Sequence, residues 1–286
     1  MKNFLNINDL DKNLIYKIIT GKKINGSLKN KKIGTIYEKP STRTRLSFEK
    51  AIIDLKGSCI NINFSDLNFS RSESFADTFK TLGLYLDALI YRTDKHSKLE
   101  EATKYFDKPI INALSDTSHP CQALADFYTL HSLFGTLKLN ICWSGDINNV
   151  LKSLIDICSL FPEINLHIFS HKILFNKLPG KLTKNIYTYS SIDYKILAKA
   201  DAIMTDVFIS MNDQKNQNKE KLLKKFQVNE KLMSHTKKKC FFMHCLPAYE
   251  GNEVSRETLR GPKSVIWKQA YNRYVAQKAL LQILEI

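Results

Sequence analysis

Apolar runs that predict β-strands alternate along this chain with longer segments whose apolar residues recur at helical spacing. In the first half, strands are expected at residues 32–38, 58–63 and 88–92, and helices at residues 44–55 and 75–86. Alternation of this kind is typical of α/β folds, in which helices pack on a parallel sheet.

A second series of strands follows a long amphipathic segment at residues 121–134. Gly135 ends that helical pattern, and further strands are expected at residues 138–144, 165–170, 202–206 and 240–244. We therefore expect two α/β domains, residues 1–135 and 136–271, each with a central parallel sheet. Residues 272–286 have helical spacing and are expected to form a C-terminal helix that packs back on the first domain. The polar run at residues 212–225 is predicted to be a mobile surface segment.

Composition supports a folded protein and adds one unusual feature, a large positive charge. Of the 286 residues, 43% are hydrophobic and 25% are charged, which is enough apolar material for a substantial core. The 43 Lys and Arg residues exceed the 28 Asp and Glu residues by 15, which invites a nucleic-acid or anion-binding interpretation. The lysines are scattered, however, with local clusters only at residues 29–32 and 237–239, so a nucleic-acid partner is not expected.

Cysteine usage and hydropathy point to the cytoplasm. The six cysteines show neither a C-x-x-C pair nor zinc-ligand spacing, so we expect free thiols in a reducing compartment and no metal. The sequence shows no apolar run of about 18 residues and no signal-peptide pattern. Neither secretion nor membrane insertion is expected.

The clearest chemistry lies where the first strand passes into a helix through Ser41-Thr42-Arg43-Thr44-Arg45. Apolar residues at positions 48, 51, 52 and 55 fix one face of that helix and leave its first turn open. Amide N–H groups, hydroxyls and guanidinium groups converge there, which suits a phosphate dianion. A serine N-cap with solvated arginines would explain S-T-R alone. The added Thr44, Arg45 and preceding proline favour the phosphate site.

This segment resembles the carbamoyl-phosphate loop of the aspartate and ornithine carbamoyltransferases, which reads S-T-R-T-R. Residues 119–126, H-P-C-Q-A-L-A-D, are similar to the family segment H-P-x-Q-x-L-x-D in its ornithine-branch form. Residues 145–150, 205–211 and 272–281 also resemble family segments. Residues 244–247 read H-C-L-P, where an aspartate carbamoyltransferase is expected to carry H-P-L-P. The resemblance spans residues 34–281 with its motifs in the family order.

The resemblance implies a carbamoyl-phosphate domain followed by a Rossmann-like amino-acid domain, and it assigns roles to individual residues. Carbamoyl phosphate would be bound by Ser41, Thr42, Arg43, Thr44, Arg45, Asn68, Arg92, His119, Gln122, Cys245, Leu246 and Arg273. Ornithine would be bound by Asn149, Asp206, Ser210 and Met211. The expected catalytic residues are Arg92, His119, Asp206 and Cys245. No cofactor is implied, and relatives suggest a homotrimer with sites at subunit interfaces.

Several positions depart from the family pattern. Where relatives have Q-L-G-R-G-E, this chain carries Asn68, Ser70 and Ser72 in place of the glutamine and the two glycines. The shorter amide of Asn68 puts a contact with a neighbouring subunit in doubt. Asn212 replaces a glycine and is the residue that best tolerates a left-handed backbone after glycine. Tyr271 replaces a glutamate, and nothing in the sequence explains that change.

The implied activity is transfer of a carbamoyl group from carbamoyl phosphate to the δ-amino group of L-ornithine, giving L-citrulline and phosphate, with arginine biosynthesis as the expected setting. Related acceptors, acetylornithine and putrescine, remain as alternatives. Anabolic and catabolic enzymes share the motifs, and the sequence leaves open which group accepts the proton of the δ-amine.

A nicotinamide-dependent oxidoreductase is the main alternative of another enzyme class, because two α/β halves suit a dinucleotide fold. No G-x-G-x-x-G follows a predicted strand in the sequence, and Gly145 stands alone. The sequence therefore favours the carbamoyltransferase interpretation.

Overall fold

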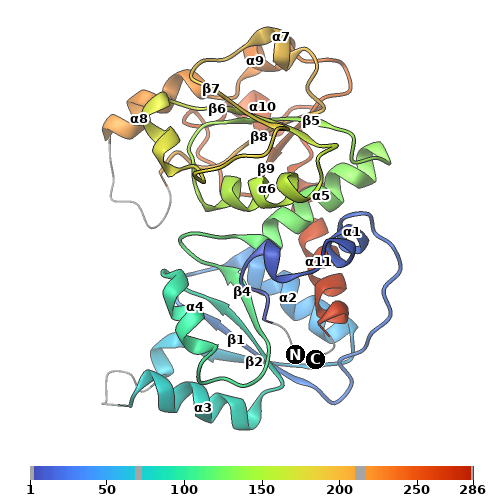
Figure 1. The fold of residues 1–286 in the computed structure, drawn as a ribbon, viewed down its shortest axis with the longest axis vertical. Helices are drawn as coiled ribbons and strands as arrows, with labels where there is room; N and C mark the ends of the chain where they lie inside the picture. Colours follow the sequence, from blue (N-terminus) through green and yellow to red (C-terminus); the bar gives the residue numbers. More distant parts are fainter. Residues whose placement is uncertain (1–2, 68–72, 210–216, 285) are drawn as a thin grey trace. The chain divides into compact units, whose positions relative to one another are not determined.

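The structure is a computed structural model that describes residues 3–67, 73–209, 217–284 and 286. The chain divides into two compact α/β units, Met1–Thr129 with Tyr271–Ile286, and Leu130–Ala270. Figure 1 shows the ribbon from the N-terminus in blue to the C-terminus in red. Each unit is described by itself below.

The first unit is built on a four-stranded parallel sheet. Its strands are β1 (Lys32–Tyr37), β2 (Ser58–Asn63), β3 (Ala88–Arg92) and β4 (Ile110–Leu114). They lie in the order β2-β1-β3-β4, and every pairing is parallel. The expected strands at residues 32–38, 58–63 and 88–92 are confirmed, and β4 is an additional strand.

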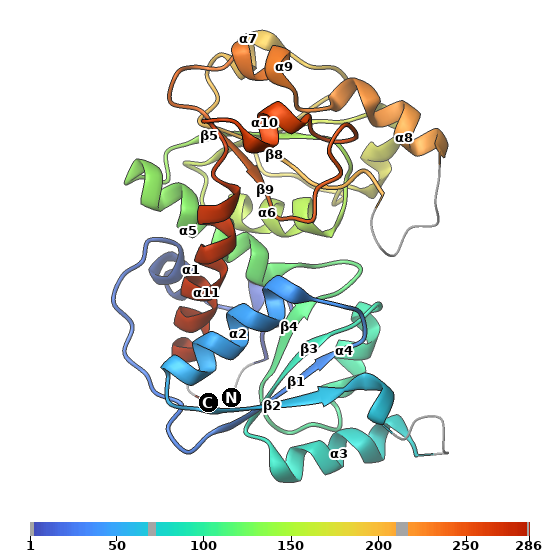
Figure 2. The ribbon, with the colours of Figure 1, turned by 180° about the vertical axis from the view of Figure 1, so that it is seen from behind.

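Helices cover both faces of this sheet, as Figures 1 and 2 show. Four of them are α1 (Lys12–Ile19), α2 (Thr42–Asp54), α3 (Phe75–Tyr85) and α4 (His96–Ala102). Two longer helices belong to both units: α5 (Pro120–Phe134) ends in the second unit, and α11 (Ile266–Ile283) begins in it. Connections through α3 and α4 lead in one direction across the sheet and the connection through α2 leads in the other. Because crossovers are right-handed, α3 and α4 lie on the face opposite to α2.

The core on the α3 and α4 face is formed by large apolar side chains. Phe79 and Tyr91 are each buried to 1% exposure or less, and their ring centroids lie 5.7 Å apart. Leu99 of α4 joins the same cluster, as do Ile36 of β1 and Leu89 of β3. On the other face, Phe48, Ala51 and Ile52 of α2 are fully buried, which confirms the apolar face expected from the sequence.

The second unit is built on a five-stranded parallel sheet in the order β7-β6-β5-β8-β9. Its strands are β5 (Asn140–Ser144), β6 (Asn165–Phe169), β7 (Ile186–Tyr189), β8 (Ala202–Thr205) and β9 (Phe241–His244). The remaining helices are α6 (Asn149–Leu160), α7 (Tyr194–Leu197), α8 (Gln217–Leu223), α9 (Glu230–Ser234) and α10 (Arg256–Arg260). Two parallel α/β sheets and a C-terminal helix confirm the expected fold class.

One sequence expectation needs correction in the described part of the chain. Residues 212–225 were expected to form a polar surface segment, but residues 217–223 form α8 and Lys219 is only 8% exposed. Its ammonium lies 2.7 Å from Oδ2 of Asp146, which is 1% exposed. The ion pair explains the burial, because a charge leaves water only when it is paired. Residues 212–216 lie outside the described residues.

Within the described residues, no helix has the length and hydropathy needed to cross a membrane.

The packing of α3 on the first sheet predicts that substitutions at two positions of this helix differ in their effect on stability. Phe79→Ala should lower the free energy of unfolding by about 3–5 kcal/mol, because it leaves a cavity beside Tyr91. Leu84→Ala, at a side chain that is 79% exposed on the same helix, should change it by less than about 0.5 kcal/mol. Urea unfolding followed by circular dichroism measures both. Equal losses would contradict the assignment of this core.

Candidate active site

Both sheets have a point where the strand order reverses, and some of the candidate residues lie at the carboxyl ends of the strands there. In the first sheet this point lies between β1 and β3, and in the second between β5 and β8. Ligands of open parallel sheets bind at such topological switch points. The topology alone therefore selects the loops after β1 and β3 in one unit, and those after β5 and β8 in the other.

The loop after β1 leads into the N-terminus of α2. Ser41 is the N-cap residue of this 13-residue helix and has an extended backbone. Thr42 is exposed, Arg43 is half-buried and Thr44 is buried, so the first turn presents both hydroxyl and guanidinium groups near its amides. The free N–H groups and positive dipole end of such a turn favour an anion.

Arg273 of α11 is the centre of a buried polar cluster in the first unit. Its Nη2 donates to Oγ1 of Thr44 at 2.7 Å, and its Nη1 donates to Oε1 of Gln122 at 2.5 Å. The same Nη1 lies 3.4 Å from Nε2 of His119. Gln122 in turn donates through Nε2 to Oδ1 of Asp126 at 2.8 Å. All five side chains are 4% exposed or less, so the structure brings together four residues predicted for carbamoyl phosphate.

His119 is held as a neutral imidazole in this cluster. Burial lowers its pKa well below the ordinary value of 6.5, and the positive charges of Arg273 and Arg92 lower it further. Arginine only donates hydrogen bonds, so Nε2 of His119 accepts and the proton sits on Nδ1. A neutral ring with an N–H group suits donation to a carbonyl oxygen.

Of the other residues predicted for carbamoyl phosphate, Arg92, Ser41 and Arg45 belong to the first unit, whereas Cys245 and Leu246 belong to the second. Arg92 is 6% exposed at the carboxyl end of β3 and acts electrostatically on His119. Ser41 and Arg45 line a pocket of about 400 Å³ together with residues of β1 and the end of β2. Arg45 is exposed and its Nε donates to Oε1 of Glu49 at 2.8 Å. Asn68 lies outside the described residues.

Asp206, directly after β8, is the centre of the site in the second unit. Its Oδ2 accepts from Nδ2 of Asn148 at 2.7 Å, and its Oδ1 accepts from the thiol of Cys245 at 3.2 Å. Asp206 is 7% exposed and Cys245 is half-buried. A carboxylate and a thiol placed side by side can hold and orient an amine. Ser210 and Met211 lie outside the described residues.

Two further predicted residues, Asn149 and Leu246, belong to the second unit. Asn149 is half-buried in the first turn of α6, and Leu246 follows Cys245 with a positive φ of 60° before a cis peptide bond to Pro247. The amide of Leu246 donates to Nδ1 of His244 at 2.9 Å. This bond fixes the backbone just after the thiol.

Asn148 is a site residue that the sequence analysis missed. It is the N-cap of α6, where its Oδ1 accepts from the amides of Val150 and Leu151 at 3.1 Å each. Its Nδ2 remains to hold Asp206. An asparagine before a helix signals the cap. The sequence carries no signal for the bond to Asp206, because the two residues are 58 positions apart.

Asp206, His244 and Cys245 each offer a ligand atom within 4.8 Å of the others. Nδ1 of His244 accepts from the amide of Leu246, and Nε2 faces Oε1 of the buried Glu253 at 3.3 Å. These contacts orient the imidazole toward protein partners, so the chemistry of the group suits a positioning role better than metal binding.

Family models match nearly the whole chain. The carbamoyl-phosphate-binding domain of aspartate/ornithine carbamoyltransferases matches residues 2–132, and the Asp/Orn-binding domain matches residues 137–284. The chain belongs to the aspartate/ornithine carbamoyltransferase family.

The relatives and solved structures that this family member resembles include several ornithine carbamoyltransferases. It is 39% identical over 267 residues to the ornithine carbamoyltransferase of Pyrococcus horikoshii, covering 90% of this chain and 84% of the relative. It is 40% identical over 275 residues to that of Methanococcus aeolicus, covering 90% and 88%. The structure matches the Pyrococcus furiosus ornithine carbamoyltransferase with a TM-score of 0.88, 36% identity and coverage of 98% and 96%. It matches the anabolic enzyme of Campylobacter jejuni with a TM-score of 0.88, 31% identity and coverage of 100% and 99%.

The neutral state of His119 predicts how stability depends on pH in this family member. Because the pKa is lower in the folded chain, the unfolded chain binds more protons below pH 6.5, and stability should fall as the pH drops from about 7 to about 5. His119→Gln removes this contribution and should make the decline shallower. Unfolding free energies of both proteins across this range measure it. Parallel curves would contradict a buried neutral imidazole.

Proposed function

We propose that this protein transfers the carbamoyl group of carbamoyl phosphate to the δ-amino group of L-ornithine, giving L-citrulline and phosphate. The observation that carries the proposal is the buried cluster in which Arg273 joins Thr44, His119 and Gln122. The family and its ornithine-named relatives support the same activity.

Carbamoyl phosphate is assigned to the first unit because its groups suit a phosphate and a carbonyl. Ser41, Thr42 and Arg43 surround the N-terminus of α2, where an anion is favoured. Arg92 and Arg273 supply further positive charge for the leaving phosphate. Neutral His119 is proposed to donate to the carbonyl oxygen as negative charge grows there, a contribution of about 3 kcal/mol for one such donor.

L-Ornithine is assigned to the second unit because its chemistry complements the groups around Asp206. Asp206 and Cys245 are proposed to orient the δ-amine, and Asn149, Ser210 and Met211 to bind the α-amino-acid end. The neutral amine forms a bond to the carbonyl carbon while the bond from that carbon to the phosphate oxygen breaks. The departing phosphate is able to take the amine proton. No covalent enzyme intermediate is required, because holding the two substrates together can lower the barrier by up to about 7–11 kcal/mol.

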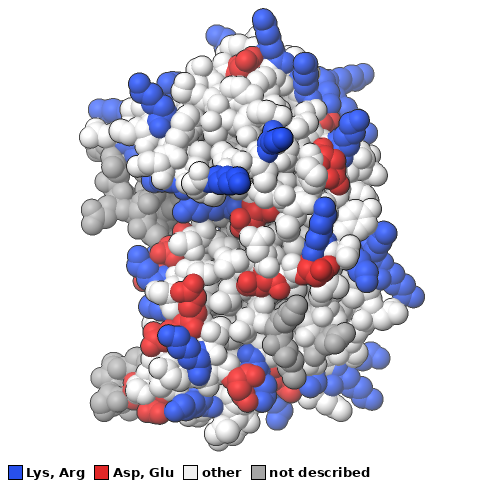
Figure 3. Space-filling model, viewed as in Figure 1, with Lys and Arg blue, Asp and Glu red and all other residues white. Residues whose placement is uncertain are grey.

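The direction of the reaction and its setting are part of the proposal. A biosynthetic role is supported by the name of the Pyrococcus furiosus relative, which is an anabolic enzyme. A cytoplasmic location remains a prediction from cysteine usage in the sequence. On the face drawn in Figure 3, Lys and Arg are dispersed with Asp and Glu between them, which does not favour a nucleic-acid partner.

We also propose assembly into homotrimers, or multiples of trimers. Leu46 and Ile53 lie two turns apart on the same side of α2 and are 59% and 64% exposed. Exposed apolar side chains grouped on one unit favour contact with another protein surface. Sedimentation of an active monomer would contradict this assembly.

The choice of acceptor is tested by offering ornithine, acetylornithine, putrescine and aspartate side by side with carbamoyl phosphate. We expect ornithine to give the highest kcat/KM, with citrulline and phosphate formed in equal amounts. Initial rates measured in both directions also test the biosynthetic assignment. Aspartate as the best acceptor would overturn the proposal, and a preference for acetylornithine or putrescine would reassign the substrate.

The contact between Cys245 and Asp206 predicts a substrate-specific defect. Cys245→Ala should lower kcat/KM for ornithine by about 10-fold or more, because Asp206 loses the group that helps it orient the amine. Cys59→Ala, at a half-buried thiol of β2, is the matched control and should change little. Steady-state kinetics at saturating carbamoyl phosphate measure both. An unchanged value for Cys245→Ala would remove the role given to this thiol.

A further inference from the structure

The pairing of β3 with β4 is irregular at Arg92. Tyr91 is paired with Asn112 of β4, whereas Arg92 is paired with Leu114, so β4 carries one extra residue, Ala113, at this point. A bulge in one strand interrupts the ladder with its neighbour. The backbone at Arg92 is therefore held by other contacts in addition to the ladder with β4.

Glu38, the first residue after β1, binds the chain on both sides of Arg92. Its amide donates to the carbonyl of Arg92 at 3.0 Å. One carboxylate oxygen, Oε1, accepts from the hydroxyl of Tyr91, and the other, Oε2, accepts from the amide of Asp94 at 3.3 Å. Glu38 thus contacts the residue before Arg92, Arg92 itself and the residue two positions after it.

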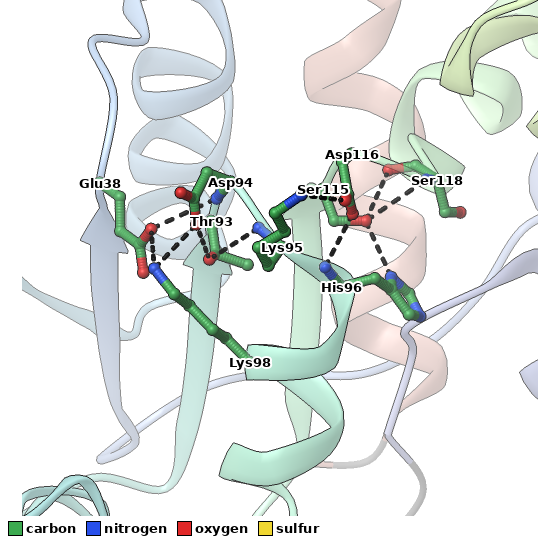
Figure 4. A network of polar contacts seen from close by, with 9 residues as sticks. All are labelled: Glu38, Thr93, Asp94, Lys95, His96, Lys98, Ser115, Asp116 and Ser118. Atoms are coloured by element: carbon green, nitrogen blue, oxygen red, sulfur yellow. Dashed lines mark hydrogen bonds and ion pairs between the residues drawn. The ribbon is translucent and has the colours of Figure 1, made fainter. Parts of the chain in front are cut away.

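The position of Glu38 is itself well fixed. Its side chain is 6% exposed, and Oε2 also accepts from Nζ of Lys98 at 3.0 Å. Lys98 lies 2.8 Å from Oδ1 of Asp94, which closes a small ring of contacts. Figure 4 shows the side chain of Lys98, from α4, reaching Glu38 at the end of β1 and Asp94 just after β3. Such a carboxylate can hold neighbouring backbone in place because its acceptors are directed and largely screened from water.

The far side of the same segment is attached to the loop that precedes His119. The amide of His96 donates to Oδ1 of Asp116 at 2.8 Å, and Nδ1 of His96 lies 2.8 Å from Oγ of Ser115. Figure 4 shows these contacts beside those of Glu38, joined through residues 93–95. The segment after Arg92 is therefore held from β1 at one end and from the loop after β4 at the other.

We propose that Glu38 is a positioning residue for carbamoyl phosphate, which acts by fixing the backbone at the end of β3 that carries Arg92. This inference rests on the proposed function. Glu38 is separated from Ser41, the start of the S-T-R-T-R loop, only by Lys39 and Pro40, so one side chain aligns Arg92 with the start of that loop. Its role is to hold geometry, and it does not touch the substrate.

The hydrogen-bonding pattern determines which replacements should preserve this role. Glutamine keeps an acceptor for the amide of Asp94, and its NH2 group can donate to the hydroxyl oxygen of Tyr91. Alanine removes both contacts. The charge of Glu38 matters less in this scheme, because its ionic partner Lys98 is 35% exposed.

The experiment compares Glu38→Ala and Glu38→Gln with the unaltered enzyme in a citrulline assay. Glu38→Ala should raise KM for carbamoyl phosphate and the inhibition constant of inorganic phosphate, and lower kcat, for a combined loss of about 10- to 100-fold in kcat/KM. KM for ornithine should stay within about 2-fold, since the second unit is unaltered. Glu38→Gln should recover most of the loss. Asp107→Ala, at a carboxylate that is 72% exposed and paired with Lys108, is the matched control.

Each outcome is decisive for Glu38. An unchanged KM for carbamoyl phosphate in Glu38→Ala overturns the inference, as does an equal loss in Glu38→Gln, which would indicate a role for charge. If Glu38→Ala does not fold, Tyr91→Phe removes a single hydroxyl from the same contact and should raise KM for carbamoyl phosphate about 3-fold or more; no rise overturns the inference. Failure of the unaltered enzyme to form citrulline would instead refute the proposed function.

Discussion

Burial of one guanidinium group organises the first unit. Arg273 is 2% exposed, and removing an unpartnered cation from water costs several kcal/mol, so the fold must supply acceptors around it. Those acceptors come from the first turn of α2 and the beginning of α5, which brings three segments far apart in sequence to one place. Burial lowers the pKa of His119, and the charge of Arg273 lowers it further. A single buried cation therefore fixes geometry and adds to the effect of burial on protonation. Its named acceptors are uncharged, which suits a site whose anion arrives with the substrate.

The two units use the same kind of sheet topology to build sites for ligands of opposite charge. In each, the strand order reverses in the middle of a parallel sheet, and the loops on either side of that point carry the chemistry. The first unit surrounds its switch point with guanidinium groups, hydroxyls and a helix N-terminus, which favour an anion. The second places the carboxylate of Asp206 there, in contact with the thiol of Cys245, which follows the neighbouring strand β9, and these two groups favour an amine. The net charge of the whole chain is +15, but the charge of each site is set by a few side chains, which make the first site positive and the second negative.

Local patterns in the sequence predict many of the strands and helices. The features that they do not predict depend on contacts between residues far apart in the chain. Apolar alternation locates β1, β2 and β3, and the apolar face of α2 is visible from Phe48 and its neighbours. The roles of Asn148 and Glu38 are not visible, because their partners lie 58 and up to 60 positions away. Lys219 shows the same limit. A lysine in a polar run indicates surface until the tertiary fold supplies a buried carboxylate.

The burial of Lys219 also bears on chemical selectivity. A carbamoyl donor reacts with amines in general, and a lysine-rich protein that handles one is itself rich in competing nucleophiles. The amine of Lys219 is 2.7 Å from Asp146, in the turn before the helix that carries Asn149. Its side chain is only 10% exposed, so it is both shielded and engaged. An ammonium held in this way has no free electron pair with which to attack a carbamoyl donor, so the ion pair protects Lys219 itself from carbamoylation.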